Sequence, residues 1–495
     1  MDSLLIKEAK KLVDYSHEVG IKPYIYLEQI TYLIFLKLID EGVFEKNRSG
    51  DEKLVMEEEV YYDQASRYEW KNWVDKPREE LADFLRNEVF PFMSSLENEE
   101  RIINEVFNNA KLQIESPEVL HGIVHIINSI NFSEAEYNDR VNFFDYLVNY
   151  LLRDRDWQLA QYWTPRDVSK LIVELIKPNE NSNILDPSCG SGTLLAEFLD
   201  FYRDKNQATF SVTGVDLSRS MIRLTLLNLL MRNVLNANIY RADFLRSNGG
   251  LRDDILQKKF DIIVADPPLK EIIPKEEVRE GLADYSKRAE ILYLNAINQS
   301  LTENGIAAVI LPDSFLFSPM KDYLFTRREM INSNQILGII SLPKGAFSPH
   351  HSISLNLLIF RKGSSQSENK IWFYELDQND RHRLSIRDQD FDSQYGEIIE
   401  LWSEYRNTEY NNPPGPKASE QLDVVDQEPH FWWASQDQIR QNDYDLTFNL
   451  YRPLVSKEYE TKAPMELMGE IKVLSEQINK ELSKLEVKVS DLSND

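Results

Sequence analysis

Seven short apolar runs, rich in β-branched residues, alternate with stretches of helical periodicity between about residue 160 and residue 362. The runs are NILDPS, FSVTGVDLS, ANIYRADF, FDIIVADPP, GIAAVILPD, QILGIISLP and ISLNLLIFRK. Amphipathic stretches such as GTLLAEFLDFYRDK and RSMIRLTLLNLLMRN separate the first runs. Because strands that alternate with helices favour a mostly parallel sheet covered on both faces, the sequence predicts one α/β domain over residues 156–362.

The flanking regions have other patterns. Residues 1–155 are predicted to form a helical domain, because YIYLEQITYLIFLKLIDEG has helical apolar spacing that ends at Gly42, and similar spacing recurs in REELADFLRNEVFPFM and VLHGIVHIINSINF. The linker-like GSSQSEN follows Lys362 and opens a mixed C-terminal extension, residues 363–463, with IWFYELD as an expected strand.

The C-terminal segment, residues 464–495, is predicted to be a helix with one apolar stripe of coiled-coil type. The stripe consists of Leu467, Ile471, Leu474, Ile478, Leu482, Leu485 and Val489. Its position among charged residues at the end of the sequence favours docking on a partner helix, and the alternative is packing on its own domain.

Composition sets further limits. The longest nearly unbroken apolar stretch, Tyr32 to Ile39, is far shorter than the roughly 20 residues that span a bilayer. The N-terminus lacks the pattern of a secretion signal, and the one cysteine, Cys189, excludes an intramolecular disulfide framework and a cysteine-rich zinc site. We therefore expect a cytoplasmic protein without a membrane partner.

The net charge of −26 is unevenly divided, with −14 in residues 1–150, +1 in residues 151–362 and −13 in residues 363–495. A protein that grips DNA alone usually carries a basic stripe. If this chain acts on nucleic acid, a partner is expected to supply much of the phosphate contact. The alternative is that the acidic flanks only keep the protein soluble.

A glycine-rich turn and three acidic strand ends predict a nucleoside-like ligand. In ILDPSCGSGTLLAEF, Gly190 and Gly192 allow a tight turn and close approach of a ligand to the backbone. Asp186, Asp216 and Asp243 close the first three predicted strands, and ligands of open α/β sheets bind at the carboxyl ends of strands. The G-x-G pattern alone is also compatible with a plain strand–helix turn.

The fourth predicted strand ends in ADPP, residues 265–268. Pro267 and Pro268 lack N–H groups and make a stiff, extended turn, which leaves nearby carbonyl groups free to accept hydrogen bonds. Asp266 adds a side-chain acceptor next to them. Two adjacent acceptors suit an exocyclic amine, which has two N–H donors.

With the preceding QYWTPR, the motifs DPSCGSG, TGVDLS, RADF and ADPPL resemble those of S-adenosylmethionine-dependent N6-adenine DNA methyltransferases. The arrangement is most similar to the modification (M) subunit of type I restriction–modification systems. YLEQITYLIFLKLIDE, LPDSFLF, ISLPKGAF and NDYDLTFNLYRP carry the likeness over nearly the whole chain. It implies a Rossmann-like, seven-stranded methyltransferase sheet, a helical N-terminal domain and a C-terminal helix that docks on a specificity (S) subunit, with two M per S. DNA is the implied substrate, and a restriction (R) nuclease subunit is left open as a further partner.

The resemblance also implies roles for single residues. Those that hold S-adenosylmethionine are Gln161, Tyr162, Thr164, Pro165, Asp186, Ser188, Gly190, Ser191, Gly192, Asp216, Asp243 and Phe244. Among them, Asp216 is implied to bind the ribose hydroxyls, and Asp243 with Phe244 to contact the cofactor's adenine. Asp266, Pro267, Pro268 and Leu269 form the implied catalytic turn, into which a target adenine is flipped. No metal is required.

Two residues depart from the family pattern. Asp266 stands where the M subunits usually have Asn, which keeps an acceptor. Leu269 stands where the family has an aromatic residue that stacks on the flipped base, a contact that contributes about 1–3 kcal/mol. Phe315 or Phe317 is an alternative source of a ring, and each is equally compatible with a core position.

Other candidates are weaker. His121 and His125 lie four residues apart on an expected helix, a spacing that can bind zinc, but a third ligand is not evident. His350 and His351 precede the last strand and fit either a plain loop or a position that faces the active cleft, and Cys189 fits a small residue of the cofactor turn.

The function expected from these residues is site-specific N6-adenine DNA methylation by a subunit that works with a specificity subunit. Two alternatives stay open. One is a catalytically impaired M-like scaffold of a defence complex, which Leu269 and the acidic flanks favour. The other is a protein-glutamine methyltransferase, against which the helical N-terminal domain and the C-terminal helix argue.

Overall fold

A computed structural model describes most of the chain. The described residues are 4–42, 65–95, 105–153, 164–203, 211–234, 237–246, 248–269, 271–282, 286–343, 347, 354–363, 369–376, 391–418, 421–422, 429–455, 468, 472 and 474–479.

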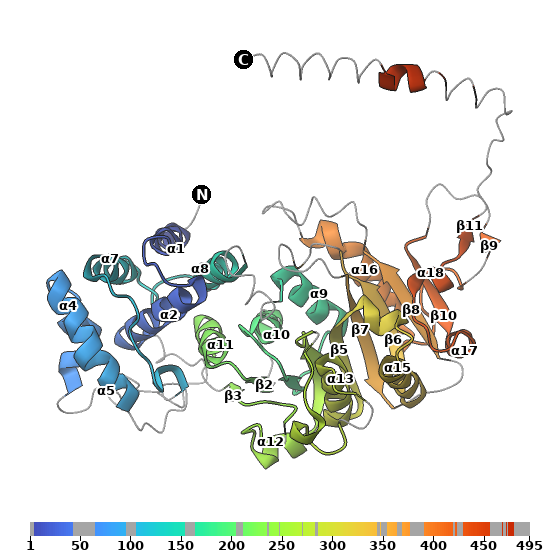
Figure 1. Ribbon diagram of the computed structural model, residues 1–495, viewed down its shortest axis with the longest axis horizontal. Coiled ribbons are helices and arrows are strands. Elements are labelled where there is room, and N and C mark those ends of the chain that lie inside the picture. Colours follow the sequence, from blue (N-terminus) through green and yellow to red (C-terminus); the bar gives the residue numbers. More distant parts are fainter. Residues whose placement is uncertain are drawn as a thin grey trace. The chain divides into compact units, whose positions relative to one another are not determined.

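The N-terminal region is helical, as the apolar spacing predicted (Figure 1). Its described α-helices include α1 (Leu4–Tyr15), α2 (Pro23–Asp40), α4 (Arg78–Phe84), α5 (Phe90–Ser95), α7 (Pro117–Asn128) and α8 (Tyr137–Val148). Helix α2 is buried almost all round, begins at a proline and is followed by Gly42 with φ of +58°. A single π-helical turn, Leu85–Val89, joins α4 to α5, so REELADFLRNEVFPFM forms one continuous helical segment.

All seven predicted runs are strands of one sheet. They are β1 (Asn183–Asp186), β2 (Ser211–Asp216), β3 (Asn238–Arg241), β4 (Phe260–Ala265), β5 (Leu301–Pro312), β6 (Asn334–Ser341) and β7 (Leu355–Lys362). The sheet continues through β8 (Lys370–Glu375) and β10 (Phe431–Ser435) in the order β10-β8-β6-β7-β5-β4-β1-β2-β3. It therefore has nine strands rather than seven. Strands β7 and β10 run antiparallel to their neighbours and the others are parallel.

Helices cover both faces of the sheet, as expected of a largely parallel sheet whose strands are buried on both sides (Figure 1). The first face packs on α9 (Arg166–Ile176), α10 (Thr193–Arg203), α11 (Arg219–Met231) and α16 (Phe391–Asn407). The second face packs on α12 (Asp253–Gln257), α13 (Ala289–Ser300), α14 (Asp313–Phe317), α15 (Lys321–Ser333), α17 (Gln436–Gln441) and α18 (Phe448–Tyr451).

Alternate strand residues divide between two apolar cores. In β1, Ile184 faces the first core and Leu185 the second; in β8, Trp372 faces the first and Phe373 the second. The first core is continuous with the core of the N-terminal helices. The helical region and one face of the sheet are therefore packed as one hydrophobic unit, with α11 between α2 and the sheet.

Residues after Lys362 contribute to this sheet, because β8 pairs with β6 and β10 pairs with β8. By density of contacts, residues 1–418 and 430–452 form one compact unit. The predicted domain boundaries at residues 155, 362 and 463 stay predictions about folding units.

A second, small unit comprises residues 419–429 and 453–495. In it β9 (Gln421–Leu422) and β11 (Leu454–Val455) pair in parallel. Most of the predicted C-terminal helix lies outside the described residues. The described residues of this segment, 468, 472 and 474–479, are helical, and Leu474 and Ile478 are exposed. No helix in the described ranges is long and apolar enough to cross a membrane.

Candidate active site

Two acids close neighbouring strands at the carboxyl edge of the sheet. Asp186 is the last residue of β1 and Asp216 the last residue of β2, and both are buried. Asp186 accepts a hydrogen bond from the Ser188 amide at 3.0 Å. Asp216 accepts one from the Gly190 amide at 3.0 Å and one from the Ser218 amide at 2.7 Å. The two carboxylates therefore fix the turns that follow their own strands.

The glycine-rich turn between β1 and α10 needs its glycines. Gly190 and Gly192 have φ of +52° and +77°, values that residues with a Cβ rarely adopt. A Cβ on Gly192 would lie 2.7 Å from the Cγ2 atom of Thr225 on α11. The Thr225 hydroxyl donates to the Gly190 carbonyl at 2.7 Å, and the Asn228 amide donates to the Ser191 carbonyl at 3.1 Å. Two side chains of helix α11 therefore hold the turn by hydrogen bonds to its carbonyl groups.

The third strand end is different. Asp243 follows β3, accepts from the Leu245 amide at 2.9 Å and pairs with the Arg246 guanidinium at 2.9 Å. Phe244 is buried and lies under the guanidinium of Arg279, 4.8 Å from its ring centroid. This loop is held by its own basic residues, in contrast to the first two strand ends.

The Asp-Pro-Pro turn follows β4 beside β1. The Thr164 hydroxyl donates to Asp266 Oδ2 at 2.9 Å, and the Ser188 hydroxyl lies 3.5 Å from the Asp266 carbonyl oxygen. Pro267 is buried, and Asp266, Pro268 and Leu269 are partly buried. The structure therefore brings together residues from three predicted motifs: QYWTPR, DPSCGSG and ADPPL.

Burial raises the pKa of all three carboxyl groups that meet here. It raises the pKa of Asp216 to about 6 although two backbone amides oppose the shift. It raises the pKa of Asp266 to about 7 although the Thr164 hydroxyl opposes the shift. The pKa of Asp186 also lies well above its ordinary value, through burial and then through repulsion from Asp266 and Asp216. Titratable groups shifted by burial within one cluster are typical of functional sites.

Leu269 packs against the first apolar core. Of the two aromatic alternatives, Phe315 is 1% exposed and belongs to the second core, whereas Phe317 is 50% exposed at the end of α14. Helix α14 directly follows β5, whose carboxyl end lies beside that of β4. Phe317 is therefore the ring that is free of the core.

Tyr293 was not predicted. It is a partly buried residue of α13, and its pKa is raised by burial and then by the carboxylates of Asp243 and Asp216. The pKa of its hydroxyl group thus responds to the negative charge of acids in this site. Nothing in the surrounding sequence distinguishes it from a core residue of an apolar helix.

Some of the remaining candidate residues are described by the structure and others are not. Thr164 and Pro165 are buried, whereas Gln161, Tyr162, His350 and His351 lie outside the described residues. Cys189 is buried in the glycine-rich turn, where burial raises the pKa of its thiol.

On α7, the Nε2 atoms of His121 and His125 are 3.0 Å apart. Among the residues that the structure describes, no three histidine, cysteine, aspartate or glutamate side chains are grouped to hold a metal ion.

Two family models match this chain. The model of the N-6 DNA Methylase family matches residues 139–460, and that of the HsdM N-terminal domain matches residues 11–127. The EcoEI methylase subunit of a type I restriction enzyme of Escherichia coli is 26% identical over 380 residues, which cover 70% of this chain and 72% of the relative. The MjaVII methylase subunit of Methanocaldococcus jannaschii is 24% identical over 428 residues, covering 80% and 67%.

Solved structures share the fold. A chain from a study of complex assembly in a type I R-M system superposes with a TM-score of 0.69 at 20% identity and covers 99% of both chains. The type I methyltransferase subunit of Streptococcus thermophilus gives a TM-score of 0.65 at 16% identity, covering 90% of this chain and 99% of its own.

The fold and the site define a DNA methyltransferase of the class that modifies an exocyclic amino group. The chain belongs to the N-6 DNA methylase family, and its two matched regions together are those of the methylase (M) subunits of type I restriction enzymes. It is accordingly an adenine-specific DNA methyltransferase subunit.

Proposed function

We propose that this chain transfers the methyl group of S-adenosylmethionine to N6 of an adenine flipped out of duplex DNA. The observation that carries the proposal is the convergence of Thr164 and Ser188 on Asp266, next to the buried acids Asp186 and Asp216. This arrangement puts Asp266, an acceptor for an amino group, next to the acids at the carboxyl ends of β1 and β2, where a nucleoside would bind.

The residues present fit S-adenosylmethionine by charge and by shape. Within the described part of the chain, Asp186, Asp216 and Asp266 form no ion pair, and the pKa of each is raised. A ligand that carries a sulfonium and an ammonium group would relieve this excess of negative charge. The left-handed turn at Gly190 and Gly192 brings bare backbone to the same edge.

We assign the holding residues as the family resemblance implies. Asp216 would bind the ribose hydroxyls, and Asp186, Ser188 and the turn glycines the amino-acid part, with Ser191 in the same turn. Asp243 and Phe244 would contact the adenine. To the residues that the resemblance implies we add Tyr293, whose pKa is raised by burial and then by the nearby Asp243 carboxylate. Gln161 and Tyr162 would close over the cofactor together with Thr164 and Pro165. When bound, the cofactor supplies an electrophilic methyl group.

The chain's own contribution to chemistry is positioning. The ionised Asp266 carboxylate and the Pro267 carbonyl accept hydrogen bonds from the amino group of the target adenine, which orients the nitrogen lone pair. Thr164 orients the carboxylate through its hydrogen bond. Because the pKa of Asp266 is about 7, the same carboxylate is also able to take up the proton that the nitrogen loses.

The partners proposed are DNA and a specificity subunit, with two methylase chains per specificity chain, in the cytoplasm. The strongly acidic flanks of the sequence support the need for a specificity subunit. Their negative charge repels the phosphate backbone of DNA, so the chain alone is expected to bind DNA weakly. The C-terminal stripe of apolar residues is the proposed contact with the specificity subunit, and a nuclease subunit would join the same complex.

One observation favours the second candidate function, a scaffold that binds cofactor without transferring methyl groups. Leu269 packs against the core at the position where the family has a stacking aromatic residue. The exposed ring of Phe317 favours an active enzyme, because α14 follows β5, the strand next to β4, and an exposed ring at that edge of the sheet is a candidate to replace the missing one.

The deciding experiment is transfer of labelled methyl groups by the chain in complex with its specificity subunit. We expect label in DNA from the native complex and none from a complex that carries Asp266→Ala. Cofactor binding without any transfer by the native complex would establish the scaffold, and label in protein rather than DNA would contradict both.

A further inference from the structure

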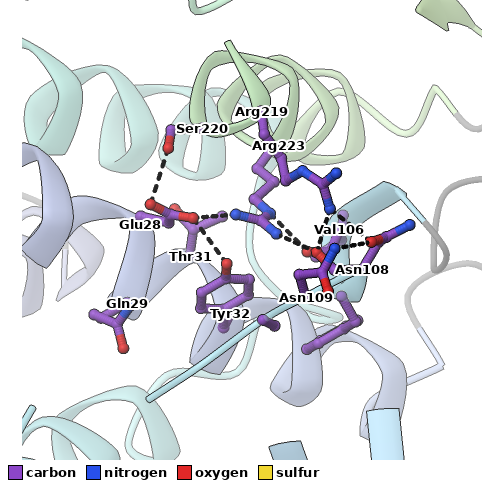
Figure 2. Close-up of polar contacts among 12 residues, drawn as sticks. Glu28, Gln29, Thr31, Tyr32, Val106, Asn108, Asn109, Arg219, Ser220 and Arg223 are labelled. Atoms are coloured by element: carbon purple, nitrogen blue, oxygen red, sulfur yellow. Dashed lines mark hydrogen bonds and ion pairs between the residues drawn. The ribbon is translucent and has the colours of Figure 1, made fainter. Parts of the chain in front are cut away.

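A buried polar cluster joins the N-terminal helices to the methyltransferase sheet (Figure 2). Glu28 on α2 forms an ion pair with Arg223 on α11, whose side chain is 4% exposed. The Tyr32 hydroxyl donates to Glu28 Oε1 at 2.8 Å, and the Ser220 hydroxyl donates to Glu28 Oε2 at 2.9 Å. Both oxygens of one carboxylate are therefore occupied, and two of their three partners lie on α11.

The same arginine holds a second segment of the helical region. Arg223 donates to the carbonyl oxygens of Val106 at 2.7 Å and Asn108 at 2.8 Å, and its guanidinium lies 4.9 Å from the ring centroid of Tyr32. Arg219, one helical turn earlier, donates to the Asn108 carbonyl at 2.7 Å. Figure 2 shows these donors converging from α11 on α2 and on the segment around Asn108.

The cluster acts on the end of α11 that adjoins the cofactor site. Helix α11 begins at Arg219, and its N-cap Ser218 donates its amide to Asp216 at 2.7 Å. Arg219, Ser220 and Arg223 thus occupy the first two turns after the acid assigned to the ribose. Farther along, Thr225 bonds the glycine-rich turn. Any shift of α11 along its axis would move both contacts.

Buried ion pairs are poor sources of net stability, and in some proteins they instead fix one arrangement of the packed elements. Helix α11 is apolar along most of its length, from Met221 to Met231 apart from a few polar residues. Apolar packing alone tolerates small sliding movements. The ion pair with Glu28 specifies one position.

We propose that Glu28 is a positioning residue for the cofactor site: through Arg223 and Ser220 it sets the position of α11, and through α11 that of Asp216 and the glycine-rich turn. This inference rests on the proposed binding of S-adenosylmethionine at that turn. The helical N-terminal region would then influence cofactor binding indirectly, because none of the described contacts of Glu28 is with a residue that we assign to cofactor binding.

The test compares two variants of the full chain in its complex. Glu28→Gln keeps the size of the side chain and removes its charge, and Ser220→Ala removes one hydrogen bond and leaves the ion pair. We expect the KM for S-adenosylmethionine to rise about tenfold in Glu28→Gln, within the range usual for coupled sites, with kcat nearly unchanged. Ser220→Ala should raise the same KM by a smaller factor, and it keeps the test decisive if Glu28→Gln does not fold.

Glu375→Gln is the matched control, because it breaks the pair between Glu375 on β8 and Arg452. That pair lies near the other edge of the sheet from β2. The control should lower the unfolding temperature and leave the KM for the cofactor unchanged.

If Glu28 has a purely structural role, Glu28→Gln should only reduce the fraction of folded enzyme. The apparent kcat would then fall at an unchanged KM, and that result would overturn the inference. If Glu28→Gln does not fold, an unchanged KM in Ser220→Ala overturns it. Failure of the native chain and of Glu375→Gln to bind cofactor would instead overturn the proposed function, and this inference with it.

Discussion

The Thr164 hydroxyl donates a hydrogen bond of 2.9 Å to the Oδ2 atom of Asp266, although 102 residues separate the two along the chain. Burial raises the pKa of Asp266 to about 7 and this hydrogen bond works in the opposite direction. The pair thereby connects the segment before α9 with the Asp-Pro-Pro turn, and it opposes the rise in the pKa of Asp266.

The first prediction is a pH dependence of methylation. Because the ionised Asp266 carboxylate is the stronger acceptor and is the form that can take up the proton lost by the target amine, kcat/KM should rise with pH through about 7. Asp266→Asn should remove this rise, because an amide oxygen accepts at every pH. Initial rates of methyl transfer between pH 5.5 and 8.5 are the measurement.

Thr164 offers a matched pair of variants for the same profile. Thr164→Val should move the midpoint to higher pH, because the carboxylate loses its donor, and Thr164→Ser should leave the midpoint in place. An identical profile in Thr164→Val would show that the hydroxyl does not act on Asp266.

The second prediction concerns stability. Folding raises the pKa of the Asp266 carboxyl group from 3.8 to about 7, so the folded state disfavours its ionised form. Its ionisation therefore lowers the free energy of unfolding. This destabilisation is absent below about pH 4, grows as pH rises and is complete above about pH 7. Asp266→Asn should therefore stabilise the chain increasingly over this window. Each pKa unit corresponds to about 1.4 kcal/mol, which sets an upper limit of about 4 kcal/mol, lessened by the solvent that reaches a partly buried group.

Urea unfolding at pH 5 and pH 8 measures this difference. Asp254→Asn is the control, because that side chain is more than half exposed and pairs with Arg252 at the surface. An equal gain at both pH values, or a gain of the same size in the control, would show that burial of Asp266 is not the cause.

The third prediction is that Phe317 supplies the ring that stacks on the flipped base. Phe317→Ala should lower kcat/KM about tenfold, the effect of losing roughly 1–2 kcal/mol of stacking. Leu450→Ala removes a comparably exposed apolar side chain from α18 and should have no effect. Methyl transfer to DNA is the readout, and full activity of Phe317→Ala would remove the assignment.

Leu269→Tyr tests the same contact from the other side. In the native chain the new ring should raise activity little, because Phe317 already stacks, whereas in Phe317→Ala it should restore most of the loss. If the neighbours of Leu269 cannot admit a ring, the variant loses stability instead, because overpacking of a core strains it.

The fourth prediction is that Gly192→Ala abolishes cofactor binding and lowers stability by about 1–3 kcal/mol. The new Cβ would meet the Thr225 methyl group at 2.7 Å in a backbone conformation with φ of +77°. Thr225→Ser removes that methyl group and keeps the hydroxyl that bonds Gly190, so it should restore part of the stability but not all. Calorimetric titration and thermal unfolding measure the two effects.

The fifth prediction concerns the C-terminal segment. Deletion of residues 464–495 should leave folding and cofactor binding intact and abolish assembly with the specificity subunit, because the apolar stripe is the proposed contact. Size-exclusion chromatography of the mixed subunits distinguishes the outcomes. Normal assembly of the shortened chain would place the interface elsewhere.

The sheet was predictable where each strand is a buried apolar run bounded by turn residues, which is true of β1 to β7. It was not predictable beyond β7. Strand β8 was expected as a strand but assigned to a separate extension, because GSSQSEN resembles a linker. Strand β10 is short and aromatic, and its pairing with β8 joins segments about 60 residues apart, which no local pattern encodes.

The candidate site shows the same limit. Acids at strand ends and glycines in a turn are visible in the sequence, because their role follows from local geometry. Tyr293 and the pair of Glu28 with Arg223 were not visible, because their positions depend on how distant helices pack. The alternative between Phe315 and Phe317 also needed the structure, since both fit an apolar segment equally well.

The strand order has a consequence for synthesis on the ribosome. Every acid of the candidate site has been translated by residue 266, whereas the last strand of the sheet, β10, ends at Ser435. At about 5–20 residues per second, roughly 10–30 seconds separate the two events. During part of that interval β4 has an unpaired edge, until β5 has been synthesised. Strand β6 likewise lacks both of its neighbours until β7 and β8 have been synthesised. A nascent chain therefore holds the complete set of proposed cofactor acids well before it holds the sheet that positions them.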